Sequence, residues 1–265
     1  MRIFKNSNDR NVNLKQNSKH SFSLNHTMML YRRNAIYTFI PKNGCSTLRL
    51  SVAIDNGVIN DISEGDWIHS NNQTFNATLE ESIKTKYSFV ILRCPFRRLA
   101  SAFLDKIVSK EVEAWSYRIA RNRSINLDDI SFEDFVFSLK ELSILNSNIH
   151  WRKQVDFLLY KKYSDYFCLE NFSLIEKRLR KRLAFHVIDA RELTGHGTEG
   201  YTKLVDENYA SMDAFDISVL KRKGFCPSYS SLYTDELVEV VSRIYSEDIE
   251  LYKSKFGSEN LLFKV

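Results

Sequence analysis

The sequence has few cysteines and prolines for its 265 residues. Its four cysteines, Cys45, Cys94, Cys168 and Cys226, are widely spaced and form no Cys-x-x-Cys pair, so they fit neither a zinc site nor a disulfide framework. A reducing cytoplasm is therefore the expected compartment. Two of the three prolines stand out, because each ends a short apolar run where a turn or a helix start is expected.

Long apolar runs are also missing from the chain. No stretch approaches the ~18 apolar residues that a bilayer-spanning helix needs, and the N-terminus lacks the hydrophobic core of a secretory signal. We therefore expect a soluble chain without a membrane span, with a soluble fragment of an anchored protein as the alternative. The sequence contains no internal repeat or low-complexity block either.

The chain carries only a small excess of positive charge. Its formal net charge of +5 favours anionic partners but decides little by itself. The basic cluster at residues 176–182 fits a solvated helix face better than a polyanion-binding strip. The sequence has no pattern typical of a nucleic-acid-binding motif and no carboxylate cluster, so we expect neither a nucleic-acid partner nor a metal.

Hydrophobic periodicity predicts an α/β fold. Short apolar runs at residues 35–40, 89–92, 166–169 and 185–188 are predicted strands, and the segments between them have helical periodicity. Such alternation favours a central parallel sheet, here in a single domain over residues 35–265. Residues 1–34 are rich in Asn, Ser, Lys and Arg, and we expect them to form a poorly ordered polar arm.

The first apolar run ends in a loop that is suited to binding a phosphate. Pro41 turns the chain, Gly44 lets the backbone approach a ligand closely, and the amides that open the following helix point at an anion. Lys42 adds a positive charge to this loop. Because Lys42 precedes Gly44, the loop is not a Walker A sequence, which argues against an ATPase or a kinase.

A second segment repeats this design. The apolar run over residues 89–92 ends at Arg93, Pro95 is suited to a first helical turn, and Ser101 follows Arg93 by eight residues. Two anion sites of this kind predict a ligand that is phosphorylated at both ends.

The two segments together resemble the donor-binding motifs of the carbohydrate sulfotransferases, the family that includes chondroitin 4-O-sulfotransferases and heparan sulfate 2-O-sulfotransferase. The resemblance is carried by Pro41-Lys-Asn-Gly-Cys-Ser-Thr47 and by Arg93-Cys-Pro-Phe-Arg-Arg-Leu-Ala-Ser-Ala-Phe103, in which Cys94 replaces the family's usual Asp. A weaker likeness spans residues 35–257. The resemblance implies a P-loop NTPase-like three-layer sandwich around a central parallel sheet.

The resemblance also implies the reaction. A sulfuryl group would pass in line from 3'-phosphoadenosine 5'-phosphosulfate (PAPS) to a hydroxyl of a carbohydrate acceptor, and adenosine 3',5'-bisphosphate would leave without help from a metal. The acceptor would be a polysaccharide, an oligosaccharide or a glycolipid precursor, and a bacterial cytoplasmic enzyme is the expected setting. Lys42 would stabilise the leaving phosphate. The residues expected to hold the donor are Lys42, Asn43, Gly44, Cys45, Ser46 and Thr47 at the 5' end, and Arg93, Ser101, Arg222, Lys223 and Gly224 at the 3'-phosphate.

Two histidines are candidates for the general base, since imidazole suits proton transfer near neutral pH. His69 lies between the two donor motifs, a placement that resembles the catalytic histidine of heparan sulfate 2-O-sulfotransferase. His150 lies in a His-Trp element that is similar to one in the chondroitin sulfotransferase branch. A Glu, an Asp or no side-chain base is the third possibility. His186 is expected inside a buried strand, and His20 and His26 in the polar arm.

Two other functions stay open from the residues alone. A P-loop-like kinase of unusual sequence would need an acidic residue and Mg²⁺ beside the first loop. A non-catalytic nucleotide-binding module is the other alternative, although the intact Lys42 speaks against lost catalysis.

Overall fold

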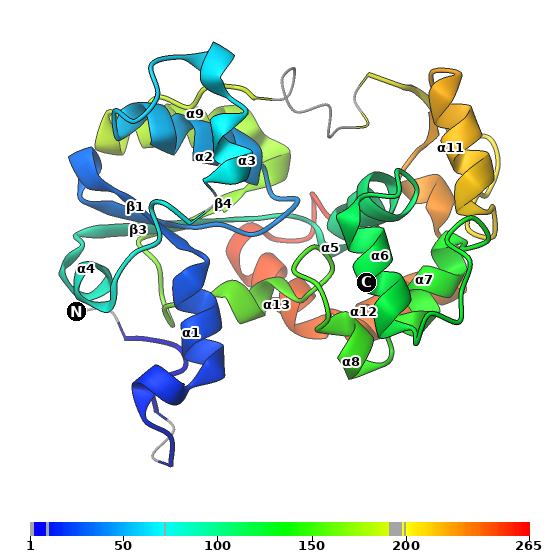
Figure 1. Cartoon of the computed structure of the whole chain (residues 1–265), viewed down its shortest axis with the longest axis horizontal. Coiled ribbons are helices and arrows are strands. Elements are labelled where there is room, and N and C mark those ends of the chain that lie inside the picture. Colours follow the sequence, from blue (N-terminus) through cyan, green and yellow to red (C-terminus); the bar gives the residue numbers. More distant parts are fainter. Residues whose placement is uncertain (1–2, 9–10, 72, 191–197, 199) are drawn as a thin grey trace. The chain divides into compact units, whose positions relative to one another are not determined.

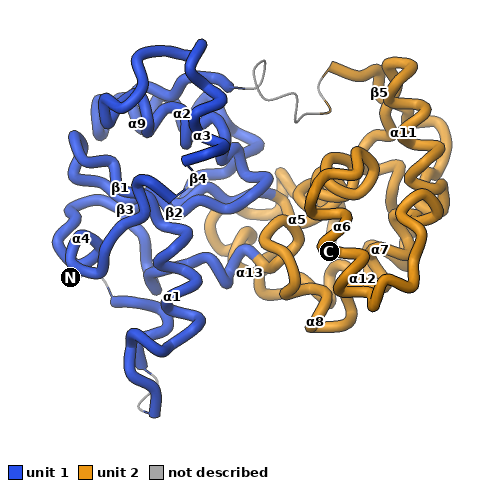
Figure 2. Tube along the Cα trace, viewed as in Figure 1, with its two compact units in different colours: residues 1–93, 154–195 blue, residues 94–153, 196–265 orange. Residues whose placement is uncertain are grey.

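The computed structural model describes residues 3–8, 11–71, 73–190, 198 and 200–265 (Figure 1). The chain divides into two compact units (Figure 2). Unit 1 contains residues 1–93 and 154–195, and unit 2 contains residues 94–153 and 196–265. The chain leaves the sheet of unit 1 after residue 93, forms most of the first half of unit 2, and returns to unit 1 at residue 154. The single domain predicted over residues 35–265 stays a prediction.

Unit 1 is built on a four-stranded sheet with the order β1-β2-β3-β4. Its strands are β1 (Thr27–Leu30), β2 (Ala35–Thr38), β3 (Tyr87–Leu92) and β4 (Asp165–Cys168). β1 runs antiparallel to β2, whereas β2, β3 and β4 are parallel. The predicted central sheet of mostly parallel strands is thus confirmed, and the carboxyl ends of three strands meet at one edge.

Helices cover this sheet. In Figure 1, α2 (Cys45–Asp55) and α9 (Phe172–Leu183) lie on one side and α1 (Ser18–Asn25) on the other. Alternate residues of the strands face α2 and α9. The apolar core formed there includes Tyr37, Phe89 and Phe167 from the strands, Leu48, Leu50, Val52 and Ala53 from α2, and Ile175 and Leu179 from α9. Burial on both faces explains why the strands are short apolar runs. The P-loop-like detail of this fold stays a prediction.

Shorter elements complete unit 1. They are η1 (Leu14–Gln16), η2 (Tyr31–Arg33), η3 (Ile62–Glu64), α3 (Trp67–Ser70), α4 (Leu79–Lys84), η5 (Gln154–Phe157) and η6 (Leu169–Asn171).

The N-terminal segment differs from the polar arm predicted over residues 1–34. Its described part carries η1, α1 and β1, and β1 pairs with β2 from Thr27 to Leu30. His20 is only 3% exposed. Met28, Met29 and Leu30 are buried. This apolar segment therefore forms a strand at the edge of the sheet, although the sequence before it is polar.

The predicted strand at residues 185–188 does not form. His186 is exposed, so it is not the core residue that the sequence indicates. The backbone of this segment bonds to side chains of α2 and not to a neighbouring strand. The amide of Ile188 donates to Ser51 Oγ at 2.8 Å, and the amide of Ala190 donates to Thr47 Oγ1 at 3.3 Å.

Unit 2 is mainly helical. Its helices are α5 (Pro95–Ala102), the π-helix η4 (Phe103–Ile107), α6 (Val112–Ala120), α7 (Phe132–Ser138), α8 (Leu142–Leu145), α11 (Ala214–Arg222), η7 (Ser230–Leu232), α12 (Asp235–Ile244) and α13 (Ser246–Phe256). The strands β5 (Thr202–Leu204) and β6 (Phe225–Pro227) form a small parallel pair. Aromatic rings fill the core, with Phe103, Phe135 and Trp151 all fully buried. Within the described residues, no helix is both long and apolar enough to cross a bilayer.

Candidate functional site

The loop after β2 has an unusual backbone. Lys42 has a φ of 69° and Gly44 a φ of 74°, so two residues of the loop lie in the left-handed region. For Lys42 this conformation is strained, whereas glycine adopts it readily. Gly44 is the N-cap of α2 and has no side chain to cap the helix, so the first-turn amides face the loop. A Cβ at Gly44 would also meet Leu169 Cδ1 at 3.1 Å, a tight contact that would add to the strain of the positive φ.

Arg93 lies beside this loop. Its Nη1 donates a hydrogen bond to the carbonyl oxygen of Lys42 at 2.8 Å. The structure thus brings together the two cationic residues that the sequence assigns to different phosphates of one ligand. Both are partly buried, where a positive charge interacts more strongly with an anion than it does in bulk water.

A buried glutamine fastens the two segments to each other. Gln154 is 1% exposed, and its Oε1 accepts from Asn43 Nδ2 at 2.7 Å and from the Arg93 amide at 3.0 Å. Its Nε2 donates to the Arg93 carbonyl at 2.9 Å. Asn43 Nδ2 also donates to the carbonyl of Ile91 in β3 at 2.9 Å. The Asn43 side chain therefore anchors the loop to the sheet, and its backbone amide donates to the carbonyl of Ile40 at 3.1 Å, so Asn43 has a structural role in addition to the predicted role in donor binding.

The other loop residues differ in their accessibility. Cys45 and Ser46 are partly exposed in the first turn of α2, as a contact with a ligand requires. Thr47 is 5% exposed, and its Oγ1 already accepts the amide of Ala190. The Thr47 hydroxyl thus has a structural role in addition to the role in donor binding that the sequence predicts.

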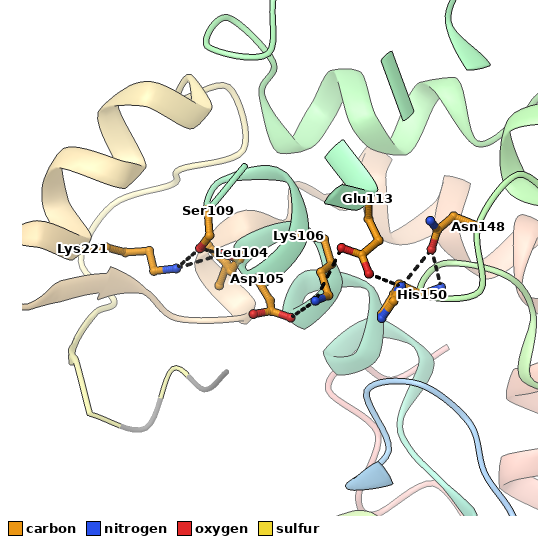
Figure 3. Close-up of polar contacts among 8 residues, drawn as sticks. All are labelled: Leu104, Asp105, Lys106, Ser109, Glu113, Asn148, His150 and Lys221. Carbon is orange, nitrogen blue, oxygen red and sulfur yellow. Dashed lines mark hydrogen bonds and ion pairs between the residues drawn. The ribbon is translucent and has the colours of Figure 1, made fainter. Parts of the chain in front are cut away.

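In unit 2, His150 is held in a row of polar side chains (Figure 3). Its Nδ1 lies 2.9 Å from Asn148 Oδ1 and 3.5 Å from Glu113 Oε1. The second oxygen of Glu113 lies 3.6 Å from the ammonium of Lys106, which is 3.4 Å from Asp105. The His150 and Glu113 side chains are 16% and 21% exposed. An acceptor and a carboxylate at Nδ1 favour the tautomer with its proton there, which leaves the lone pair on Nε2.

The turn that carries His150 is itself fixed by buried groups. Arg98, 2% exposed on α5, donates to the carbonyls of Ile149 at 3.0 Å and Arg152 at 2.7 Å. The Tyr245 hydroxyl donates to the carbonyl of Trp151 at 2.5 Å. Arg98 belongs to the second motif of the sequence, so the structure gives that motif a further role in supporting the His-Trp turn.

His69 has a different environment. It is exposed at the end of α3, a helix of four residues in unit 1. His69 and His150 therefore lie in different units, one on a short exposed helix and the other among partly buried polar side chains.

The remaining predicted residues belong to unit 2. Ser101 is 7% exposed on α5. Arg222 ends α11, and Lys223 and Gly224 form the exposed turn before β6, with Gly224 at a φ of 87° and open space around it. The second motif thus crosses the boundary between the units, with Arg93 in unit 1 and Ser101 in unit 2.

Sequence reasoning missed Gln154 and Glu113. A single Gln or Glu outside any motif has no local signal, because its role depends on partners such as Arg93 and His150 that are distant in the sequence. Among the residues that the structure describes, no group of three or more His, Cys, Asp or Glu side chains could hold a metal ion.

Comparison with known proteins identifies the class of this chain. Residues 25–255 match the model of the sulfotransferase family, and the chain belongs to that family. It is similar to human carbohydrate sulfotransferase 10, with 28% identity over 171 residues that cover 54% of this chain and 48% of the relative. The match thus spans about half the length of that relative. No solved structure matches the chain.

Proposed function

We propose that this chain transfers a sulfuryl group from PAPS to a hydroxyl of a carbohydrate and releases adenosine 3',5'-bisphosphate. Membership of the sulfotransferase family supports sulfuryl transfer, and the human relative's name supports a carbohydrate acceptor. The observation that carries the donor assignment is the hydrogen bond from Arg93 to the Lys42 carbonyl, because it joins two motifs that each suit an anion.

Lys42 acts on the leaving group in this proposal. As the bond from sulfur to the 5'-phosphate oxygen breaks, negative charge grows on that oxygen, and the Lys42 ammonium and the first-turn amides of α2 stabilise it. Arg93 binds the 3'-phosphate through a charge-assisted hydrogen bond, with Ser101 and the turn over residues 222–224 as further donors. The reaction needs no metal, since these groups balance the charge themselves.

His150 is the general base that the contacts favour. Its Nε2 takes the proton from the acceptor hydroxyl as the oxygen attacks sulfur, and the imidazolium that results is stabilised by Glu113 at Nδ1. Glu113 is thus a positioning residue that acts through His150. His69 is the second candidate, because it shares unit 1 with the donor loop.

The test is transfer of labelled sulfate from PAPS to a panel of polysaccharide and oligosaccharide acceptors, in EDTA and without added metal. We expect activity in the wild type and a large loss in Lys42→Ala. We also expect His150→Ala to lose turnover and His69→Ala to keep it. The opposite result for the two histidines would assign the base to His69. Transfer from ATP with Mg²⁺, and none from PAPS, would instead identify a kinase.

A further inference from the structure

Unit 2 has a hollow on its surface beside α6. It has a volume of about 440 Å³ and is lined by residues of α6 and of the turn that follows it. Trp115 stands at this hollow and is 50% exposed, although a Trp side chain is usually mostly buried. Arg118 lies near the indole, with its guanidinium carbon 6.0 Å from the ring centroid.

The walls of this hollow are positively charged. Lys110, Arg118 and Arg123 all line it. Asp128 is the acid among the residues around it, and Asp128 is paired with Lys110. The two arginines therefore carry an excess of positive charge into a concave surface, where their forked donors suit carboxylates and sulfates.

The backbone of the turn that carries Arg123 is fixed to the end of α6. Asn122 and Arg123 have φ angles of 55° and 60°, and the Arg123 amide donates back to the Arg118 carbonyl at 2.8 Å. Arg118 Nε donates to the carbonyl of Ile125 at 3.1 Å, which fastens the same turn to α6. The two arginines are thus connected through the backbone and do not lie on independent flexible segments.

A second hollow also borders Lys110. Its volume is about 430 Å³, and Lys110 lines both hollows. It is lined by Phe215, which is 48% exposed, by Tyr201 and by the basic residues Lys221 and Arg222. Both hollows therefore combine an exposed aromatic ring with cationic side chains.

We propose that these two hollows form one groove that binds an acidic oligosaccharide, as a docking site for the acceptor chain outside the reacting hydroxyl. The inference rests on the proposed function for its link to an acceptor. The apolar faces of the sugar rings pack on Trp115 and Phe215, while the carboxylates or sulfates of the chain pair with Arg118 and Arg123. A neutral glycan would use the rings and leave the arginines unpaired, which is why the charge selects an acidic one.

The test is binding of a fluorescein-labelled chondroitin octasaccharide to the full chain, followed by anisotropy at low and at physiological salt. We expect Trp115→Ala and the double variant Arg118→Ala/Arg123→Ala each to weaken binding about tenfold. Val112→Ala and Arg243→Ala are the matched controls. Val112 is 77% exposed on the same helix and Arg243 is 74% exposed on α12, and neither lines the groove, so we expect wild-type affinity. Added salt should weaken the wild type more than the double variant.

Several results would contradict the proposal that this groove binds an acidic oligosaccharide. They are wild-type affinity in Trp115→Ala, equal loss in the Val112→Ala control, equal binding of a neutral maltooctaose, and equal or tighter binding of a DNA oligonucleotide of the same charge. Binding of adenosine 3',5'-bisphosphate is measured on the same variants and should not change. If that nucleotide fails to bind the wild type while the octasaccharide depends on Trp115, the donor assignment is wrong and the groove stands.

Discussion

The two units hold their functional groups in different ways. In unit 1, the donor loop is fixed by backbone conformation and by the buried amides of Asn43 and Gln154, which are 0% and 1% exposed. In unit 2, His150 and Glu113 are held by charged and polar neighbours that remain 16% and 21% exposed. Buried neutral hydrogen bonds respond little to salt or pH, whereas partly exposed charges respond to both. Variants of the buried amides in unit 1 should therefore change donor affinity and stability, whereas variants of the polar groups around His150 in unit 2 should change turnover and its pH dependence.

The largest effect is expected for Lys42→Ala. Loss of the ammonium removes charge stabilisation of the leaving phosphate, and we expect turnover to fall by about 10²–10³-fold. The measurement is the rate of sulfate transfer at saturating PAPS. Lys84→Ala is the control, because Lys84 is 73% exposed on α4 of the same unit. Comparable losses in both variants would remove the special role of Lys42.

Glu113→Gln tests the charged arrangement in unit 2. The amide keeps the shape of the side chain but no longer stabilises a positive imidazole, so turnover should fall by roughly 10–100-fold. The acid limb of the pH profile of turnover should move to lower pH, since the protonated form of His150 loses its carboxylate partner. A role in folding alone would not move that limb.

The matched control for this variant is Glu250→Gln, at an exposed position of α13. We expect it to keep the wild-type profile and the wild-type KM for PAPS. An unchanged pH profile in Glu113→Gln would show that Glu113 does not act through the base.

Gln154→Leu tests the neutral arrangement in unit 1. Leucine leaves the Arg93 amide and the Asn43 side chain without their shared acceptor, which should cost about 1–3 kcal/mol of stability. Affinity for adenosine 3',5'-bisphosphate should fall about tenfold as the loop loosens. Thermal unfolding and calorimetric titration measure the two effects. Gln73→Leu, at an exposed position of unit 1, is the control. Wild-type affinity in Gln154→Leu would contradict the anchoring role.

The smallest effect is expected from His20. Burial lowers the pKa of the His20 imidazole below its ordinary value of 6.5, and its ring lies 5.1 Å from that of Phe4. The unfolded chain therefore takes up a proton at a higher pH than the folded one, so stability falls as the pH drops below about 6.5.

His20→Phe should remove this contribution, so the thermal midpoint should depend less on pH between about 7.5 and 5.5 than in the wild type. His186→Phe, at an exposed position, is the control. An identical dependence on pH in His20→Phe and wild type would show that His20 does not contribute.

Much of this molecule could be predicted from local patterns. The loop around Lys42 and the strands that precede Pro41 and Arg93 are encoded within short segments, and the structure contains these predicted elements. β1 was not predicted, because a strand of four residues that follows a polar segment is too short to show a clear hydrophobic pattern. The roles of Gln154 and Glu113 were not predicted, because they depend on partners that are distant in the sequence. The strand predicted at residues 185–188 failed because side chains of α2 took the place of a neighbouring strand.

The most direct test of the account is calorimetric titration with adenosine 3',5'-bisphosphate and with adenosine 5'-monophosphate, both in EDTA. We predict that the wild type prefers the bisphosphate by at least about tenfold and that Arg93→Ala loses this preference, while Lys42→Ala keeps it. An unchanged preference for the bisphosphate in Arg93→Ala would contradict the assignment of the 3'-phosphate to Arg93. It would also contradict the proposal that the donor is bound at both of its phosphorylated ends.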